Sequence, residues 1–236
     1  MPGTQLIVLD GLPGAGKTTN GQWLARYMGE HGQTVSFLAE FDTDHPLWWY
    51  DYWDGNDYHP PEYHNNPIES FLSNSLDRWR EFTATKQTTP GSVVVAESLF
   101  FQDAVSMFLM GDAAPETLKA YAHTVQRLAQ PLNPMLIYFR QPDVSAALQR
   151  ICTIRGSDFQ QELVANMESF PYLKHRRLTG LAGIAQLWQA IQALTDSLYA
   201  EYKLPKIAID TSAEAWAQYR QEMLQFIQPG HGWINV

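Results

Sequence analysis

The chain has 236 residues, 45% of them hydrophobic, and its 25 acidic residues outnumber its 16 lysines and arginines to give a formal net charge of -9. This length and hydrophobic content suit one large α/β domain, or a core with an insertion, and are ample for a substantial core. The negative charge argues against a nucleic acid polymer as partner, and the single cysteine, Cys152, excludes an intrachain disulfide and a cysteine-based zinc site. Because no signal peptide or long apolar span is visible, we expect a cytoplasmic protein that does not bind a membrane.

The first predicted elements surround a glycine-rich loop. Residues 11–19 read GLPGAGKTT and fit G-x-x-x-x-G-K-[ST], the P-loop; the apolar run at 6–9 predicts a buried strand before it, and a helical pattern follows it. In this context the backbone N–H groups and the helix N-terminus bind phosphate oxygens. We therefore expect a bound nucleotide, with Lys17 at its β- and γ-phosphates and the Thr18 hydroxyl on Mg²⁺. The predicted nucleotide-binding residues are Gly11, Pro13, Gly14, Ala15, Gly16, Lys17, Thr18 and Thr19.

A second strand is predicted at 35–39 and leads to Glu40. The segment 41–66 that follows has neither helical nor strand periodicity, but it is rich in tryptophan and tyrosine. A loop of this length is usually a lid or a binding loop, and its aromatic content argues against disorder. We interpret it as an acceptor-binding loop whose rings stack on a substrate ring, while core packing or a partner surface stays open as the explanation for some of them. The candidates for substrate contact are Trp48, Trp49, Tyr52 and Trp53.

Strands and helices alternate along the rest of the chain. Strands are predicted at 93–96, 134–139 and 206–209, and helices at 68–86, around 103–110 and 115–130, from 142 to about 154, near 159–167, through 184–198 and up to 227. With a P-loop on the first strand, this order predicts an α/β three-layer P-loop NTPase fold, in which a parallel five-stranded sheet carries helices on both faces. Ligands of such sheets lie at the carboxyl ends of the strands, where Glu40, Glu97 and Arg140 fall.

Two acids and two arginines near these strand ends are candidates for phosphoryl transfer. Glu40 could take a proton from an attacking hydroxyl or orient it, whereas Glu97, at the end of an apolar run, is placed to hold Mg²⁺. Arg150 and Arg155 could neutralise charge on the migrating group. On one continuous helix these two arginines would diverge by about 140°, so the helix must end or bend before Arg155, and Gly156 favours such a break. The alternatives are ordinary strand-end or capping acids and solvated surface arginines.

The order of these residues resembles the nucleoside and nucleotide kinases of the P-loop superfamily across nearly the whole chain, deoxynucleoside kinases first and thymidylate kinases second. The resemblance implies that Glu40 is the base toward a sugar hydroxyl. After their third strand these kinases carry Glu-Arg-Ser and, six residues beyond the Glu, an Asp that binds the nucleobase. The resemblance implies that Glu97 corresponds to this Glu and Asp103 to this Asp, whereas Ser98 stands in place of the Arg.

The segment IYFRQPDVSAALQRICTIRG resembles the fourth strand and the lid helix of these kinases. A lid region at about 150–162 is therefore implied, with Arg150 and Arg155 as phosphate clamps. The spacing is one residue longer than usual, and Ser157 stands where a further Arg is expected.

Together these features predict a single P-loop kinase domain over 1–236 that uses ATP and Mg²⁺ to phosphorylate a hydroxyl of a nucleoside-like small molecule. Phe101 and Asp103 are expected to shape the acceptor pocket. One alternative is a nucleoside monophosphate kinase with Arg78 and Arg80 at the acceptor phosphate; another is a phosphotransferase that inactivates an antibiotic. A nucleotide-switch ATPase is the alternative from a different class, although the chain has no Asn-Lys-x-Asp guanine signature. A homodimer stays open.

Overall fold

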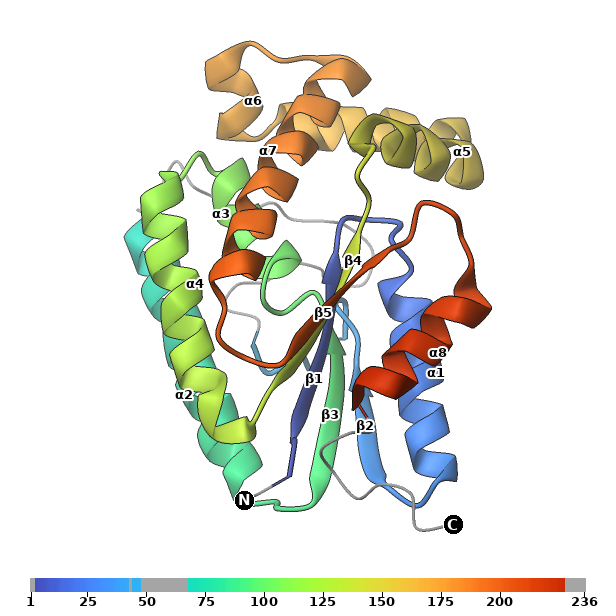
Figure 1. Cartoon of the computed structure of the whole chain (residues 1–236). Helices are drawn as coiled ribbons and strands as arrows, with labels where there is room; N and C mark the ends of the chain where they lie inside the picture. Colours follow the sequence, from blue (N-terminus) through green and yellow to red (C-terminus); the bar gives the residue numbers. More distant parts are fainter. Residues whose placement is uncertain (1–2, 43, 48–67, 228–236) are drawn as a thin grey trace.

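The computed structural model of the chain describes residues 3–42, 44–47 and 68–227. Five parallel strands form one sheet in the order β2-β3-β1-β4-β5 (Figure 1). This confirms the expected parallel sheet, and each strand lies within about two residues of its predicted position. The strands are β1 (Leu6–Gly11), β2 (Thr34–Leu38), β3 (Ser92–Glu97), β4 (Met135–Arg140) and β5 (Lys206–Asp210).

Helices cover both faces of the sheet, as the sequence predicts. One face carries α1 (Lys17–Glu30) and α8 (Trp216–Ile227), and the other carries α2 (Ile68–Gln87), α4 (Pro115–Ala129) and α7 (Gly180–Glu201) (Figure 1). A 3₁₀ turn, η2 (Gln130–Leu132), follows α4.

The central strand β1 is apolar on both sides because each side faces a layer of helices. Leu6 and Val8 belong to the core shared with α2, α4 and α7, whereas Ile7 and Leu9 belong to the core shared with α1 and α8. This alternation explains why the strand reads as an unbroken apolar run.

The segment after β3 departs from the helix expected over 103–110. A π-helical turn, η1 (Gln102–Ser106), precedes the short α3 (Met107–Met110). The turn is wide because the backbone N–H and the Oγ of Ser106 both donate to the carbonyl oxygen of Phe101, at 2.9 and 3.1 Å.

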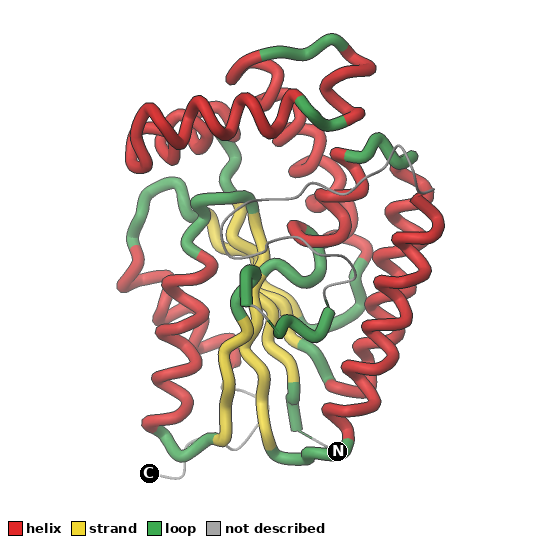
Figure 2. Tube along the Cα trace, turned by 180° about the vertical axis from the view of Figure 1, so that it is seen from behind, coloured by secondary structure: helices red, strands yellow, loops and turns green. Residues whose placement is uncertain are grey.

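The carboxyl ends of the strands are covered by α5 (Val144–Glu168), and α6 (Pro171–Arg176) lies beside it against α3 and α7 (Figures 1 and 2). The sequence predicts two helices here, at 142–154 and near 159–167. The structure has two helical segments here, which meet at a kink at Gly156, the residue with non-helical backbone angles (φ 90°, ψ 179°); together they are labelled α5. The six-residue α6 was not predicted, because a single turn and a half carries too little apolar periodicity to detect.

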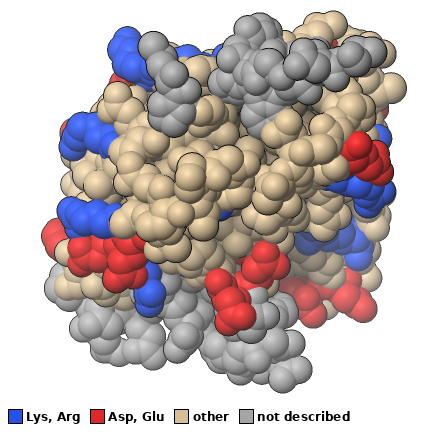
Figure 3. Space-filling view, turned by 90° about the horizontal axis from the view of Figure 1, so that it is seen from below, with Lys and Arg blue, Asp and Glu red and all other residues tan. Residues whose placement is uncertain are grey.

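The opposite end of the molecule, where the strands begin, carries charges of both signs beside one another around its rim (Figure 3). In the described part of the chain, no helix has both the length and the apolarity needed to cross a membrane.

Candidate active site

The P-loop follows β1 and turns directly into α1 at the middle of the sheet. Gly11 has φ 148°, and a Cβ at this position would lie 2.3 Å from the carbonyl oxygen of Phe139 on β4. Gly16 has φ 91°, and a Cβ there would lie 2.7 Å from the Trp216 ring. Both positions therefore require glycine, because a side chain would be strained in backbone conformation and would collide with a neighbouring element.

Asp10, the last residue before the loop, is fully buried and ties the loop to the segment after β3. Its two carboxylate oxygens accept hydrogen bonds from the backbone N–H groups of Gly11 (2.9 Å), Phe100 (2.8 Å), Phe101 (2.8 Å) and Gln102 (3.1 Å). Burial raises the pKa of the Asp10 carboxyl, and the Lys17 ammonium and the backbone donors oppose that rise. Sequence reasoning assigned no role to Asp10, although an acid at the end of an apolar run is a visible signal.

Lys17 and Glu40 are joined through a single side chain, that of Gln102. The Lys17 Nζ donates to the carbonyl oxygens of Gly11 (3.0 Å) and Leu12 (3.2 Å), and it also donates to Oε1 of Gln102. The Nε2 of Gln102 donates to Oε1 of Glu40 at 3.1 Å. The sequence gives no sign of Gln102, because only the π-helical turn places its amide between the two charged groups.

Glu40 lies two residues beyond the end of β2 and points toward the P-loop. Besides Gln102, Ser98 donates to it, from Oγ to Oε2 at 2.9 Å. Burial raises the pKa of the Glu40 carboxyl above its ordinary value; the Lys17 ammonium opposes this rise and the Glu97 carboxylate adds to it. A buried carboxyl with a raised pKa, placed beside a phosphate-binding loop, is a candidate for proton transfer.

Thr18 and Glu97 form the second pair expected from the sequence. The Thr18 hydroxyl donates to Oε2 of Glu97 at 2.6 Å, and Oε1 of Glu97 accepts from the backbone N–H of Glu40 at 3.2 Å. A hydroxyl and a carboxylate beside a phosphate loop are the hard oxygen donors that suit Mg²⁺, which keeps several waters in such sites. No group of three or more His, Cys, Asp or Glu residues able to hold a metal occurs in the described ranges. The donor set therefore fits Mg²⁺ shared with phosphate and not an all-protein metal centre.

These groups face one cavity of about 860 Å³ that crosses the carboxyl ends of the strands. Its floor is formed by Leu12–Gly14 and Gly16–Thr19 of the P-loop and by Glu40, Glu97 and Gln102. Its roof is α5, from Ala147 to Met167, and one end is closed by α3 and α7. The lining side chains from α3 and α7 are Met107, Met110, Trp188 and Ile191.

Arg150 and Arg155 both line this cavity from α5. Arg150 lies 3.4 Å from Glu214, between Nε and Oε1, and its Nη1 donates to the carbonyl oxygen of Ser212, also at 3.4 Å. The Arg155 guanidinium lies 4.8 Å from the centre of the Phe159 ring. The break in α5 comes at Gly156, after Arg155, so the expectation of a bend before Arg155 is corrected: both arginines belong to the same helical segment.

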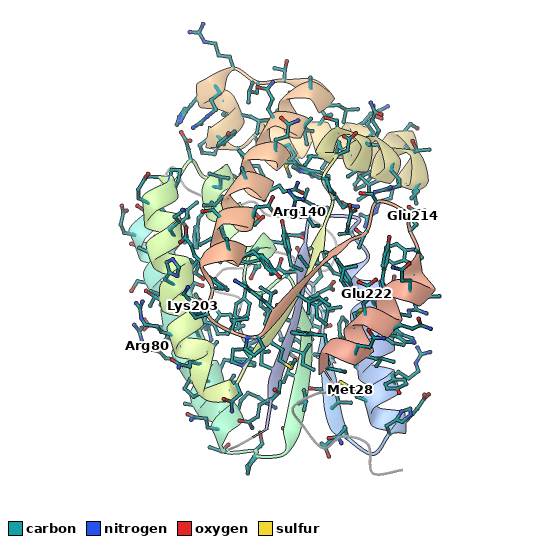
Figure 4. All side chains as sticks on the ribbon, viewed as in Figure 1. Met28, Arg80, Arg140, Lys203, Glu214 and Glu222 are labelled. Carbon is teal, nitrogen blue, oxygen red and sulfur yellow. The ribbon has the colours of Figure 1, made fainter. Side chains whose placement is uncertain are left out.

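Other strand-end and candidate residues lie outside the cavity lining. Arg140 is held by Asp196 of α7, with Nη2 2.9 Å from Oδ2 (Figure 4). Phe101 is 1% exposed, and its ring packs against Tyr138 and Tyr202, so the ring belongs to the hydrophobic core. The backbone N–H of Phe101 donates to Asp10, which holds the residue in this position.

Asp103 and Arg78 also lie outside the lining. Burial raises the pKa of Asp103 to about 8, and the carboxylates of Glu40 and Asp10 add to the rise. Arg78 is half exposed on α2 and lies 3.8 Å from Glu81, while Arg80 pairs with Asp77 on the outer side of the same helix (Figure 4). The predicted aromatic contacts Trp48, Trp49, Tyr52 and Trp53 lie outside the described residues.

No model of a known protein family matches the chain, and no curated protein matches it. Solved structures do match its fold. Thymidylate kinase from Candida albicans is 13% identical with a TM-score of 0.54, over 97% of this chain and 92% of that one. Thymidylate kinase from Ehrlichia chaffeensis is 11% identical with a TM-score of 0.53, over 96% and 100% of the two chains.

Shikimate kinase from Acinetobacter baumannii, solved in complex with shikimate, is 20% identical with a TM-score of 0.50, over 95% and 93% of the two chains. Identities this low show similarity of fold alone. The chain has the α/β fold of the P-loop kinases, in a strongly divergent sequence.

Proposed function

We propose that the protein is a Mg²⁺-ATP-dependent kinase that transfers the γ-phosphoryl group to a hydroxyl of a nucleoside-like small molecule. One observation carries the proposal: the P-loop lysine, Lys17, and a buried carboxyl, Glu40, are bound to opposite ends of the Gln102 amide. A phosphate-binding cation and a proton acceptor thus lie one side chain apart in the same cavity, and transfer to a hydroxyl requires both groups near the reacting atoms.

The donor side is formed by the P-loop. Its backbone N–H groups and the N-terminus of α1 bind phosphate oxygens, and Lys17 exchanges its contact with Gln102 for the β- and γ-phosphates. Thr18 and Glu97 are the residues that would hold Mg²⁺ at this point. When bound, the metal neutralises charge on the β- and γ-phosphates.

The acceptor side is formed around Glu40. The acceptor oxygen attacks the γ-phosphorus, so that a new O–P bond forms as the bond to the β-phosphate oxygen breaks. The hydroxyl proton passes to the Glu40 carboxylate. Arg150 and Arg155 bind the transferring group and compensate the charge that spreads over its equatorial oxygens.

Similar solved structures support this reading without identifying the substrate. Their names describe kinases of thymidylate and, in one case, a complex with shikimate, so the same fold accommodates chemically different small acceptors. The kinase alternatives, a monophosphate kinase and an antibiotic phosphotransferase, differ from the proposal only in the acceptor. The aromatic segment 41–66, the lid at about 150–162 and the role of Asp103 stay predictions.

ADP release in the presence of a panel of nucleosides, nucleoside monophosphates and hydroxylated antibiotics tests the proposal. We expect ADP release that depends on one class of acceptor, and that is lost in Lys17→Ala and in Glu40→Gln. Glu116→Gln, an exposed acid in the first turn of α4, serves as the matched control and should retain the wild-type rate. Tight ATP binding without acceptor dependence would contradict the kinase proposal and favour a nucleotide-switch ATPase.

A further inference from the structure

We propose that the acceptor is an alcohol without an anionic group, whose body is apolar and ring-sized. The inference rests on the proposed function and names the substrate class of the same site. It is carried by the charge distribution around the cavity, because the three cations in its lining are the ones that the proposed function assigns to the phosphate donor.

The cations of the chain can all be located. None of the residues outside the described ranges is lysine or arginine, so all 16 of these residues lie in the part that the structure places. Among them, Lys17, Arg150 and Arg155 line the cavity. Wherever the segment 48–67 lies, it adds four acidic side chains and no lysine or arginine.

Each of these three cations already has a role toward the phosphate donor in the proposed function. Lys17 belongs to the P-loop itself. Arg150 is held by Glu214 and the Ser212 carbonyl oxygen, in the connection that leads to α8, on the face of the sheet that also carries α1. Arg155 follows about one and a half turns further along the same straight segment of α5, with its guanidinium 4.8 Å from the centre of the Phe159 ring, and the proposed function assigns it to the transferring phosphoryl group.

The other end of the cavity is apolar. The apolar side chains come from α3 (Met107 and Met110), from α7 (Trp188 and Ile191) and from the second half of α5 (Phe159, Leu163 and Met167), which also adds Glu162 and Asn166 to the lining. The carboxylates of Glu40 and of Glu162, the latter in the second half of α5, also belong to the lining. A phosphate or carboxylate on the acceptor would lose its hydration here without gaining a cation, and would be repelled by both acids.

Exposed apolar side chains in the cavity lining also favour an apolar ligand. Phe41, with 56% of its surface exposed, and Ile154, with 74%, are the large hydrophobic residues that the structure leaves exposed, and both line this cavity. Apolar side chains that stay in contact with water at the entrance to a pocket are expected to become covered when an apolar ligand binds.

The test compares matched acceptors that differ by one anionic group, such as thymidine with thymidine monophosphate, and a cyclic alcohol with its carboxylate. Turnover is followed as ADP release, and binding to the wild-type protein is measured separately by calorimetry. We expect the non-anionic member of a pair to be preferred by at least about tenfold in kcat/KM and in Kd. Equal or reversed preference would overturn the inference, while the kinase proposal would stand if ADP release depended on the acceptor.

A charge introduced at the apolar end gives an independent test. Leu163→Arg adds a guanidinium to the lining, whereas Ala165→Arg adds the same group to an exposed position of α5 outside the lining. Leu163→Arg should shift the preference toward the anionic member by about tenfold, and Ala165→Arg should leave the ratio within about twofold. Equal shifts in both variants would overturn the inference.

Two further outcomes separate the inference from the kinase proposal. If no acceptor gives ADP, the kinase proposal fails, and the calorimetric preference still decides the charge of the ligand; absence of binding by every non-anionic compound would overturn the inference. If a monophosphate is turned over as fast as its nucleoside and this activity is lost in Arg155→Gln, Arg155 serves the acceptor and the inference is wrong.

Discussion

At the scale of single residues, Ser98 has a larger role than its size indicates. It occupies a left-handed backbone conformation (φ 66°) at the end of β3, and its hydroxyl is bound to Glu40. The resemblance to deoxynucleoside kinases placed an arginine at this position. A neutral hydroxyl stabilises the negative charge of a neighbouring carboxylate less than a positively charged guanidinium would. The raised pKa of Glu40 is consistent with the weaker stabilisation by Ser98.

Replacing Ser98 by alanine should change the pH dependence of the reaction. The Ser98 hydroxyl lowers the pKa of Glu40 against the effect of burial, so Ser98→Ala raises it further and leaves less ionised carboxylate to act as base. We expect the acidic limb of the kcat/KM profile to move to higher pH. Ser92→Ala, at the other end of β3, is the control and should leave the limb in place; an unmoved limb in Ser98→Ala would show that Glu40 does not act as the base.

Replacing Asp10 by asparagine should lower stability. Both oxygens of Asp10 are occupied by backbone donors, and an amide offers one acceptor oxygen where the carboxylate offers two. We expect the free energy of unfolding to fall by about 2–3 kcal/mol, measured by denaturant titration. In Asp143→Asn, where the side chain accepts one backbone N–H at the start of α5, a change of only a few tenths of a kcal/mol is expected.

At the scale of elements, α5 combines two straight segments that serve different parts of the cavity. The segment before Gly156 carries Arg150 and Arg155, and the segment after it carries Phe159 to Met167 of the lining. The backbone angles of Gly156 (φ 90°, ψ 179°) belong to a region that is essentially restricted to glycine. The kink therefore sets how the cationic and the apolar parts of the roof are oriented.

Gly156→Ala should disturb the roof without unfolding the molecule. No atom lies within 4 Å of a Cβ built there, so the backbone conformation is the whole cost, about 1–3 kcal/mol. We expect KM for ATP and for the acceptor to rise several-fold as α5 straightens. Gly180→Ala is the control, because Gly180 has φ 60° and no atom lies within 4 Å of a Cβ built there. If the KM values of Gly156→Ala stayed as close to wild type as those of this control, the kink would have no role in binding.

The short α6 is attached to the body of the molecule through Asp112. This residue (φ 66°) accepts hydrogen bonds from Nδ1 of His175 (2.7 Å) and Nη1 of Arg176 (2.6 Å). These partners lower the pKa of the Asp112 carboxyl against the opposing effect of burial. Arg176 is thus engaged in holding α6, where the guanidinium also lies 3.8 Å from the centre of the Tyr172 ring.

The contribution of Asp112 to stability should depend on pH. Because its pKa is lowered in the folded state, the stabilisation is present above the unfolded pKa of about 3.9 and is lost as the pH falls through the lower folded value. Asp112→Asn keeps a residue that tolerates positive φ, and it should reduce the free energy of unfolding by about 1 kcal/mol or less at pH 7. The difference from wild type should vanish in acid; a difference that persists there would mean that packing, and not charge, holds α6.

At the scale of the whole molecule, the sequence was most informative where the structure of an element depends on its own residues and not on distant contacts. The buried strands and the P-loop were predicted because unbroken apolar runs and closely spaced glycines are local signals. Gln102 and Asp112 were missed because their roles depend on side chains that are distant in sequence. The kink at Gly156 was expected, but its place relative to Arg155 depends on how α5 packs over the cavity.

Binding of Mg²⁺-ATP should stabilise the whole molecule through the P-loop. At a nucleotide concentration one hundred times Kd, the expected gain is about 2.7 kcal/mol, or roughly 5–10 °C in the unfolding midpoint of a chain of this size. The midpoint of Lys17→Ala should not move under the same conditions. A shift of equal size in both proteins would show that the nucleotide binds elsewhere.

The central place of β1 has a consequence for how the chain is made. Its Leu6 pairs with Val94 of β3 and its Ile7 with Met135 of β4, so its partners are synthesised long after it. A nascent chain that ends before β4 leaves one edge of an apolar strand without its neighbour, and such edges promote aggregation. Folding of the sheet around the P-loop must therefore wait until about three fifths of the chain, up to the end of β4, has emerged from the ribosome, and until then β1 needs protection from aggregation.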